Sequence, residues 1–191
     1  MHDQFFVDPE SVILITNDFF VRPRGLIIAG RKKIMETLNA SNIFFSFTSA
    51  GYLPSIRAAL AVLDLMEKEN VHSQLSRQGE KIMCAYNAFA RTYRVPTKAA
   101  GLGPIVGFLF KDEKGNDNLP LKSLFLQECA KEGLLTNGTA MINYAHTDKV
   151  IAEVVKRLQR TLSTVGKAVQ ENRVEKMLEG PVIKPRSRPV N

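Results

Sequence analysis

The 191-residue sequence contains no tryptophan, only two cysteines and only three histidines. Two cysteines, Cys84 and Cys129, are too few for a disulfide-stapled scaffold, and we expect each to be a small apolar side chain on a helix. The histidines, His2, His72 and His146, are far apart and lack the spacing of a metal site. The sequence therefore argues against a disulfide-rich secreted domain and against a Cys/His zinc centre.

Long apolar runs are also missing from the sequence. No stretch approaches the roughly 18 residues that a membrane-spanning helix needs. The first residues, MHDQFFVDPE, lack the basic and apolar segments of a signal peptide. We therefore expect no membrane association and a reducing, cytoplasmic location.

The remaining composition is that of a globular protein, with 45% hydrophobic and 24% charged residues. Lysine and arginine (26) exceed aspartate and glutamate (19), which gives a formal net charge of +7. A basic surface can attract phosphate ligands or nucleic acid, but charges spread along helices usually form a solvated face. The length favours one domain with at most a small part of a second.

The patterning predicts a mixed α/β architecture. Short β-branched runs predict strands at residues 12–15 and 25–30, and residues 31–38 suit a short helix. Apolar side chains at helical spacing predict helices over residues 54–66 and 71–93. The apolar run 105–110 predicts a buried strand, 112–117 a turn, 121–132 a helix with Gly133 as its left-handed cap, and 141–144 a short strand.

The last long helix is the clearest element of the sequence. Thr147 offers an N-cap hydroxyl and Asp148 a negative charge in the first turn, where both stabilise a helix. Apolar residues from Val150 to Val169 then repeat at helical spacing. We expect His146, just before the cap, to make a local hydrogen bond. After Gly180 the sequence is rich in proline, which predicts an extended tail.

One segment could carry chemistry on its residues alone. Residues 46–51 (SFTSAG) place three hydroxyls and a glycine just before a helix that begins near Pro54. Free backbone N–H groups at a helix N-terminus can bind a phosphate. A plain capping loop explains the same residues, and the residues themselves leave both interpretations open.

Several motifs, taken in order, resemble class III pyridoxal-phosphate (PLP) aminotransferases, and most closely the branch around glutamate-1-semialdehyde aminomutase. The resemblance covers nearly the whole chain. It rests on residues 30–31 (GR), 34–36 (IME), 45–51 (FSFTSAG), 58–62 (AALAV), 121–128 (LKSLFLQE), 132–135 (EGLL), 144–148 (YAHTD) and 178–182 (LEGPV). It implies the small C-terminal α/β domain of a fold-type I transferase plus a remnant of the large domain.

The resemblance also assigns candidate site residues. Thr48 matches the threonine that reaches the PLP phosphate of the other subunit, and Phe47 matches the residue before it. Gly51 matches the second glycine of the family's Gly-Gly pair, whereas Ala50 replaces the first. These matches imply PLP as cofactor, an aminotransferase-type dimer partner, and small amino donors and acceptors as substrates.

The lysine that binds PLP covalently in this family has no counterpart here. Asn17 stands at its position, and no lysine precedes Lys32. Asparagine has no amine to form a Schiff base or to transfer the proton. Residues 3–10 (DQFFVDPE) already resemble the segment that follows the family's pyridine-binding aspartate. We therefore expect no catalytic residue in this chain and no activity from the chain alone.

The predicted organisation is a large-domain remnant with the phosphate loop (1–50), a small α/β domain (51–180) and a Pro-rich basic tail (181–191). Three hypotheses for function remain. The chain is part of an aminotransferase whose N-terminal portion lies elsewhere, or it is a non-catalytic paralogue that pairs with and modulates a full-length relative. The third hypothesis is an anion or nucleic-acid module that uses Lys184, Arg186 and Arg188 of the tail. No aromatics interleave with these charges, so nucleic acid is not an expected partner.

Overall fold

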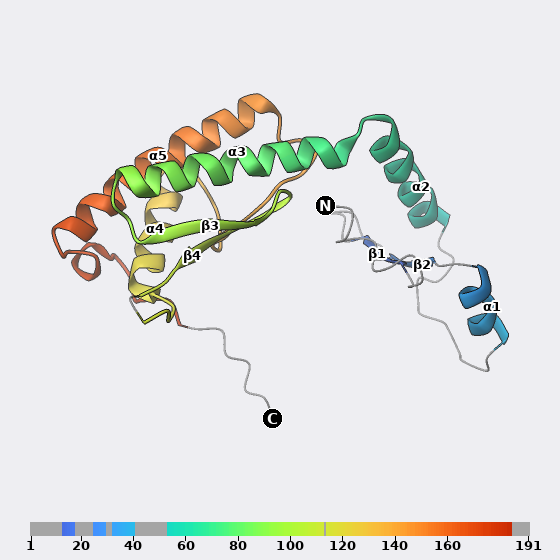
Figure 1. The fold of residues 1–191 in the computed structure, drawn as a ribbon, viewed down its shortest axis with the longest axis horizontal. Coiled ribbons are helices and arrows are strands. Elements are labelled where there is room, and N and C mark those ends of the chain that lie inside the picture. The colour runs from blue at the N-terminus through green and yellow to red at the C-terminus, as the bar shows by residue number, and fades with distance from the viewer. Residues whose placement is uncertain (1–12, 18–24, 30–31, 41–52, 113, 185–191) are drawn as a thin grey trace. The chain divides into compact units, whose positions relative to one another are not determined.

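The computed structural model describes residues 13–17, 25–29, 32–40, 53–112 and 114–184 (Figure 1). Contacts within the chain divide it into two compact units, Met1–Val71 and His72–Asn191. The expected division at residues 50 and 180 stays a prediction, and its first boundary lies outside the described residues. None of the helices in the described ranges is long and apolar enough to cross a bilayer.

The first unit contains the two predicted strands and two predicted helices. The strands pair antiparallel, with Ile13 opposite Ala29 and Asn17 opposite Gly25. Pro54 lies in the first turn of the second helix, where its missing N–H costs no intrahelical hydrogen bond. The elements are β1 (Ile13–Asn17), β2 (Gly25–Ala29), α1 (Lys32–Ala40) and α2 (Leu53–Lys68).

The second unit is a small antiparallel sheet covered by helices on one face (Figure 1). The strand order is β3-β4-β5, with Thr97 opposite Phe110 and Ile105 opposite Met141. The elements are α3 (Val71–Thr92), β3 (Thr97–Leu102), β4 (Ile105–Phe110), α4 (Leu119–Lys131), β5 (Thr139–Met141), α5 (Asp148–Gln170) and the 3-10 turn η2 (Glu175–Met177). The predicted α/β class is therefore confirmed.

An aromatic cluster joins the helices to the sheet in the core. Tyr86 of α3 stacks on Phe108 of β4, with ring centroids 4.6 Å apart, and meets Phe125 of α4 edge-on at 5.8 Å. Phe110 packs on the same Phe125 ring at 5.0 Å. The Tyr86 hydroxyl lies 2.8 Å from Thr97 Oγ1. Because Thr97 donates its own hydroxyl hydrogen to Leu109 O, Tyr86 is the donor of this pair.

The other face of the sheet is open, which corrects the prediction that residues 105–110 form a buried strand. Val106, Phe108 and Phe110 are buried against the helices, but Ile105 and Leu109 alternate with them and are exposed. Successive residues of a strand point to opposite faces, so helices on one face bury only every second residue. The strand expected at residues 141–144 also begins earlier, at Thr139.

The predicted ends of α4 and α5 are confirmed. The Thr147 hydroxyl accepts a hydrogen bond from the Val150 N–H, at 3.4 Å, which caps α5. Gly133 follows α4 with φ +73°, a left-handed conformation that glycine adopts without strain. In contrast, Cys84 on α3 is exposed, so the prediction of two apolar-packed cysteines holds only for Cys129.

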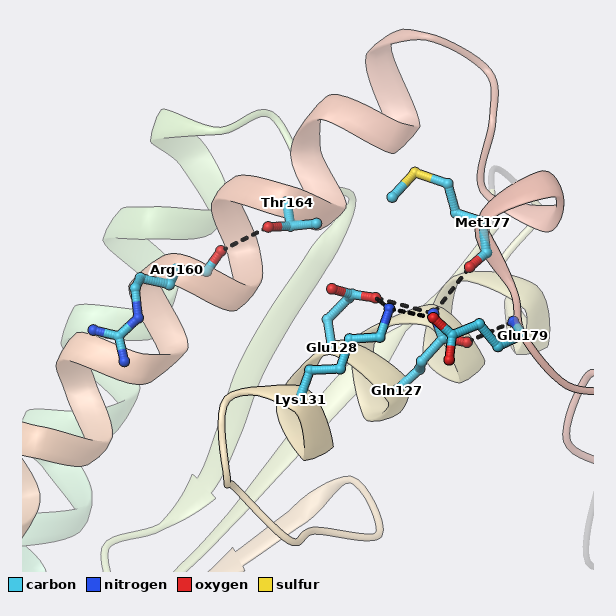
Figure 2. Close-up of polar contacts among 7 residues, drawn as sticks. All are labelled: Gln127, Glu128, Lys131, Arg160, Thr164, Met177 and Glu179. Atoms are coloured by element: carbon cyan, nitrogen blue, oxygen red, sulfur yellow. Dashed lines mark hydrogen bonds and ion pairs between the residues drawn. The ribbon is translucent and has the colours of Figure 1, made fainter.

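A polar stripe on α4 holds the segment that follows α5 (Figure 2). Gln127 donates to Met177 O at 2.9 Å and accepts from the Glu179 N–H at 2.8 Å. Lys131 contacts both Glu128 and Glu179 at 2.8 Å, and these carboxylates raise the pKa of Lys131. One helical turn earlier, Ser123 Oγ accepts from the Ile183 N–H at 3.0 Å. The described chain beyond α5 is therefore fixed to α4 by hydrogen bonds as far as Ile183.

Candidate functional site

The residues assigned to the cofactor phosphate lie outside the described residues. Phe47, Thr48 and Gly51 belong to the range 41–52, and their role stays a prediction. Asn17, which the resemblance matches to the family's lysine, is the last residue of β1, opposite Gly25 of β2. Since Phe47, Thr48 and Gly51 are outside the described residues, their distance from Asn17 stays untested.

The second unit contains a pocket of about 230 Å³ between α3, β5 and α5. Its walls are largely apolar and include Ile82, Phe108 and Leu158 of the core. The polar groups among its lining residues are Thr136, Thr139, His146 and the thiol of Cys129. No lysine, arginine or carboxylate side chain lines this pocket, so it suits a small apolar group rather than an anion.

The polar groups of this pocket serve local structure. His146 Nδ1 accepts from the Asn143 N–H at 3.2 Å, which confirms the expected local hydrogen bond. The Thr136 hydroxyl donates to Thr139 O at 2.9 Å and accepts from the Gly138 N–H at 3.1 Å. Burial raises the pKa of the Cys129 thiol to about 12. A thiol that stays protonated at neutral pH is a poor nucleophile.

A second polar cluster connects α3 to the start of α5. Gln78, which is almost fully buried, donates to Asp148 Oδ1 at 3.0 Å, and Lys81 contacts the same oxygen. Arg77 lies 3.9 Å from the other carboxylate oxygen. Hydrogen bonds from Lys81 and Gln78 lower the pKa of Asp148. The sequence identified Asp148 only as a helix-dipole residue, because these α3 partners lie far away along the chain.

Within the described ranges, no group of three or more His, Cys, Asp or Glu residues is arranged so that it could hold a metal ion.

The amino-acid sequence is similar to those of one group of enzymes. The chain is 26% identical over 110 residues to a glutamate-1-semialdehyde 2,1-aminomutase of Methanococcoides burtonii, covering 57% of this chain and 25% of that protein. It is 25% identical over 147 residues to the enzyme of the same name from Methanosarcina acetivorans, covering 68% and 33%. The chain is a partial-length homologue of these aminomutases. No protein-family model matches the sequence.

Solved structures agree on the fold. The FumI protein of Sphingopyxis sp. MTA144, in its PLP internal aldimine form, matches 75% of this chain with a TM-score of 0.62. A transaminase with PLP bound matches 78% with a TM-score of 0.65. Each is 16% identical to this chain, and the matches cover 34% and 37% of those structures. These matches confirm the prediction that the chain has the fold of part of a PLP-dependent transaminase.

The chain spans about a quarter to a third of the length of the curated relatives it matches. Tested as a PLP site, the apolar pocket among the described residues does not fit the cofactor. The apolar pocket offers neither an amine for its aldehyde, nor a carboxylate for its ring nitrogen, nor a cation for its phosphate. The candidate phosphate loop is not among these residues. No chemical step through PLP therefore follows from this geometry.

Proposed function

We propose that this chain is the C-terminal part of a class III PLP-dependent aminotransferase or aminomutase-like protein, and that it has no activity alone. The observation that carries the proposal is the partial-length homology to aminomutases, together with Asn17 at the position of the Schiff-base lysine. The reaction of the complete assembly is amino-group transfer between small amino donors and acceptors. This chain supplies structure and phosphate contacts, and another polypeptide supplies the lysine.

The cofactor of that assembly is PLP, bound in a partner subunit. Thr48 donates its hydroxyl to the partner's PLP phosphate, with the backbone at Phe47 and Gly51 alongside. The segment lies just ahead of α2, whose N-terminal dipole favours an anion. Two residues of α2, Leu53 and Pro54, are exposed and leave this helix end accessible.

The partner is an aminotransferase-type subunit, in a homo- or heterodimer. The open face of the β3-β4-β5 sheet supports this assignment, because it exposes Leu102, Ile105, Leu109 and Met141, the last to 69%. A contiguous apolar face of this kind usually marks an interface. The same argument applies to α2, where Ile56, Leu60 and Leu63 are exposed at helical spacing.

The proposal is tested by mixing the chain with a full-length glutamate-1-semialdehyde 2,1-aminomutase and measuring PLP retention by absorbance after gel filtration. Thr48→Val removes one charge-assisted hydrogen bond, worth about 1.5–3 kcal/mol. Retention should weaken roughly ten- to a hundredfold. Ser49→Ala, which the resemblance does not implicate, is the control. Equal loss in both variants would mean that the loop is only structural.

A second candidate function is that of a non-catalytic paralogue that pairs with a full-length aminotransferase and modulates it. Asn17 favours this candidate, since a paralogue without catalysis has no need of a lysine. The two functions differ in the DNA upstream of Met1. An in-frame sequence that encodes a Gly-rich loop and an aspartate supports part of an enzyme, and its absence supports the paralogue.

A further inference from the structure

A cationic pocket lies where the end of α3 turns into β3. Its volume is about 450 Å³, within the roughly 300–1,000 Å³ typical of small-molecule sites. Three of its lining residues are cations, Arg91, Arg94 and Lys98, and its apolar wall includes Ala90 and Val95. It is separate from the apolar pocket beside α5, with which it shares no lining residue.

The lining of this pocket contains cations and no carboxylate. The sequence from Lys81 to Lys111 contains no aspartate or glutamate, and no acidic side chain lines the pocket. Among the described residues, no ion pair forms with Arg91, Arg94 or Lys98. In contrast, Arg157 and Arg160 of α5 pair with Glu153 and Glu132, and Lys111 pairs with Asp117. Three cations around one hollow raise the local concentration of anions.

The backbone that carries these cations is held in place. Arg94 has φ +55°, and the turn is closed by hydrogen bonds from Arg94 N to Arg91 O (3.2 Å) and from Val95 N to Ala90 O (2.9 Å). On the strand side, Asn87 makes two hydrogen bonds to the backbone of Ala99, at 2.8 and 3.0 Å. A rigid support reduces the entropy lost when side chains close on a ligand.

We propose that this pocket binds the phosphate group of a small phosphorylated metabolite. A guanidinium presents paired N–H donors that match phosphate oxygens, and Arg91 and Arg94 supply two such groups. The site goes beyond the proposed function, because the phosphate contact implied by the family involves Thr48 in a different segment. The hollow leaves room for more than the phosphate, and its apolar wall can contact an attached carbon skeleton.

The test is a ¹H–¹⁵N NMR titration of the full chain with pyrophosphate, with sodium chloride at equal ionic strength as the reference. We expect saturable shifts at the amides of residues 91–98 and no comparable shifts with chloride. Arg94→Gln should weaken binding about tenfold, the effect of losing one charge-assisted hydrogen bond. Arg57→Gln, which removes the same charge from exposed α2, should change it less than about twofold.

Three results would overturn the proposal. Shifts that chloride reproduces would show charge screening only. Equal weakening by Arg57→Gln would show attraction by net charge rather than a site. A short single-stranded oligonucleotide that binds these residues more tightly than pyrophosphate would assign the pocket to nucleic acid. Because Thr48 and its partner subunit play no part in this titration, its failure leaves the proposed function unaffected.

Discussion

At the scale of single residues, Gly79 of α3 packs against the backbone of Gly103, which follows β3. A Cβ built on Gly79 would lie 1.5 Å from Gly103 O, and a backbone atom cannot move aside as a flexible side chain can. Replacing a helical glycine with alanine normally stabilises by about 1 kcal/mol. Here the clash should reverse the sign.

We therefore expect Gly79→Ala to lower the free energy of unfolding by about 1–3 kcal/mol, measured by urea denaturation. Gly180→Ala is the control, because a Cβ there meets no atom within 4 Å. If Gly79→Ala were as stable as the wild type, the close packing of α3 on the β3–β4 turn would be wrong.

Asp148 gives a second residue-scale prediction, on pH. Lys81 and Gln78 lower its folded pKa below the ordinary value of 3.8, so its carboxylate stabilises the folded state above that value. The contribution disappears as the pH falls through the folded pKa. Asp148→Asn should therefore melt at a lower temperature than the wild type at pH 7, and the difference should shrink as the pH falls below 3.8 and through the folded pKa.

The check is the melting temperature against pH, by circular dichroism, with Asp64→Asn on exposed α2 as the matched control. A difference between Asp148→Asn and the wild type that is constant from pH 7 to pH 2 would mean that the Lys81 and Gln78 contacts do not act through the carboxylate charge.

At the scale of elements, Asn87 protects an exposed sheet edge. β3 pairs only with β4 in the described sheet, and the Asn87 amide donates to and accepts from Ala99 as a neighbouring strand would. An open strand edge is a site for pairing with other chains. Asn87→Ala should cost about 1–3 kcal/mol and speed hydrogen exchange at the Ala99 amide, while the Phe108 amide, bonded to Gly138 O, stays protected.

The segment after α5 gives the second element-scale prediction. Gln127 makes two backbone hydrogen bonds to it, to Met177 O and from the Glu179 N–H (Figure 2). Gln127→Ala should expose the Glu179 amide to faster exchange and cost about 1–3 kcal/mol. Gln159, whose nearest partner is Tyr93 OH at 3.4 Å, provides the control variant Gln159→Ala. Equal protection of the Glu179 amide in both variants would contradict the assigned role of Gln127.

The elements also show which parts of the fold were predictable from sequence. α5 was predictable with its cap, because Thr147, Asp148 and the apolar repeat are local signals. β3 was not predicted, since its sequence TKAAGL has few β-branched residues and owes its form to pairing with β4 and to Asn87. The half-open sheet and the cationic pocket depend on which elements pack together, and no local pattern reports that.

At the scale of the whole molecule, we expect the chain to associate with a second copy of itself or with a partner subunit. The open face of the sheet exposes four large apolar side chains, those of Leu102, Ile105, Leu109 and Met141. Burying one such side chain lowers the free energy by about 1.5–3 kcal/mol, so association that covers this face is favoured. Light scattering at micromolar concentration should therefore give a mass above that of one chain. Leu109→Lys should lower the measured mass, whereas Lys111→Gln, also on an exposed side chain, should leave it unchanged. A wild-type monomer would contradict this.

We propose that this chain cannot form a Schiff base with PLP by itself and that another polypeptide supplies the lysine. The most direct measurement is an absorbance titration of the purified chain with PLP, followed by borohydride reduction and mass-spectrometric mapping. We predict no saturable one-to-one Schiff-base band and no single labelled lysine, because the resemblance places Asn17, which has no amine, at the family's lysine position. A stoichiometric PLP adduct trapped on one lysine of this chain would contradict it.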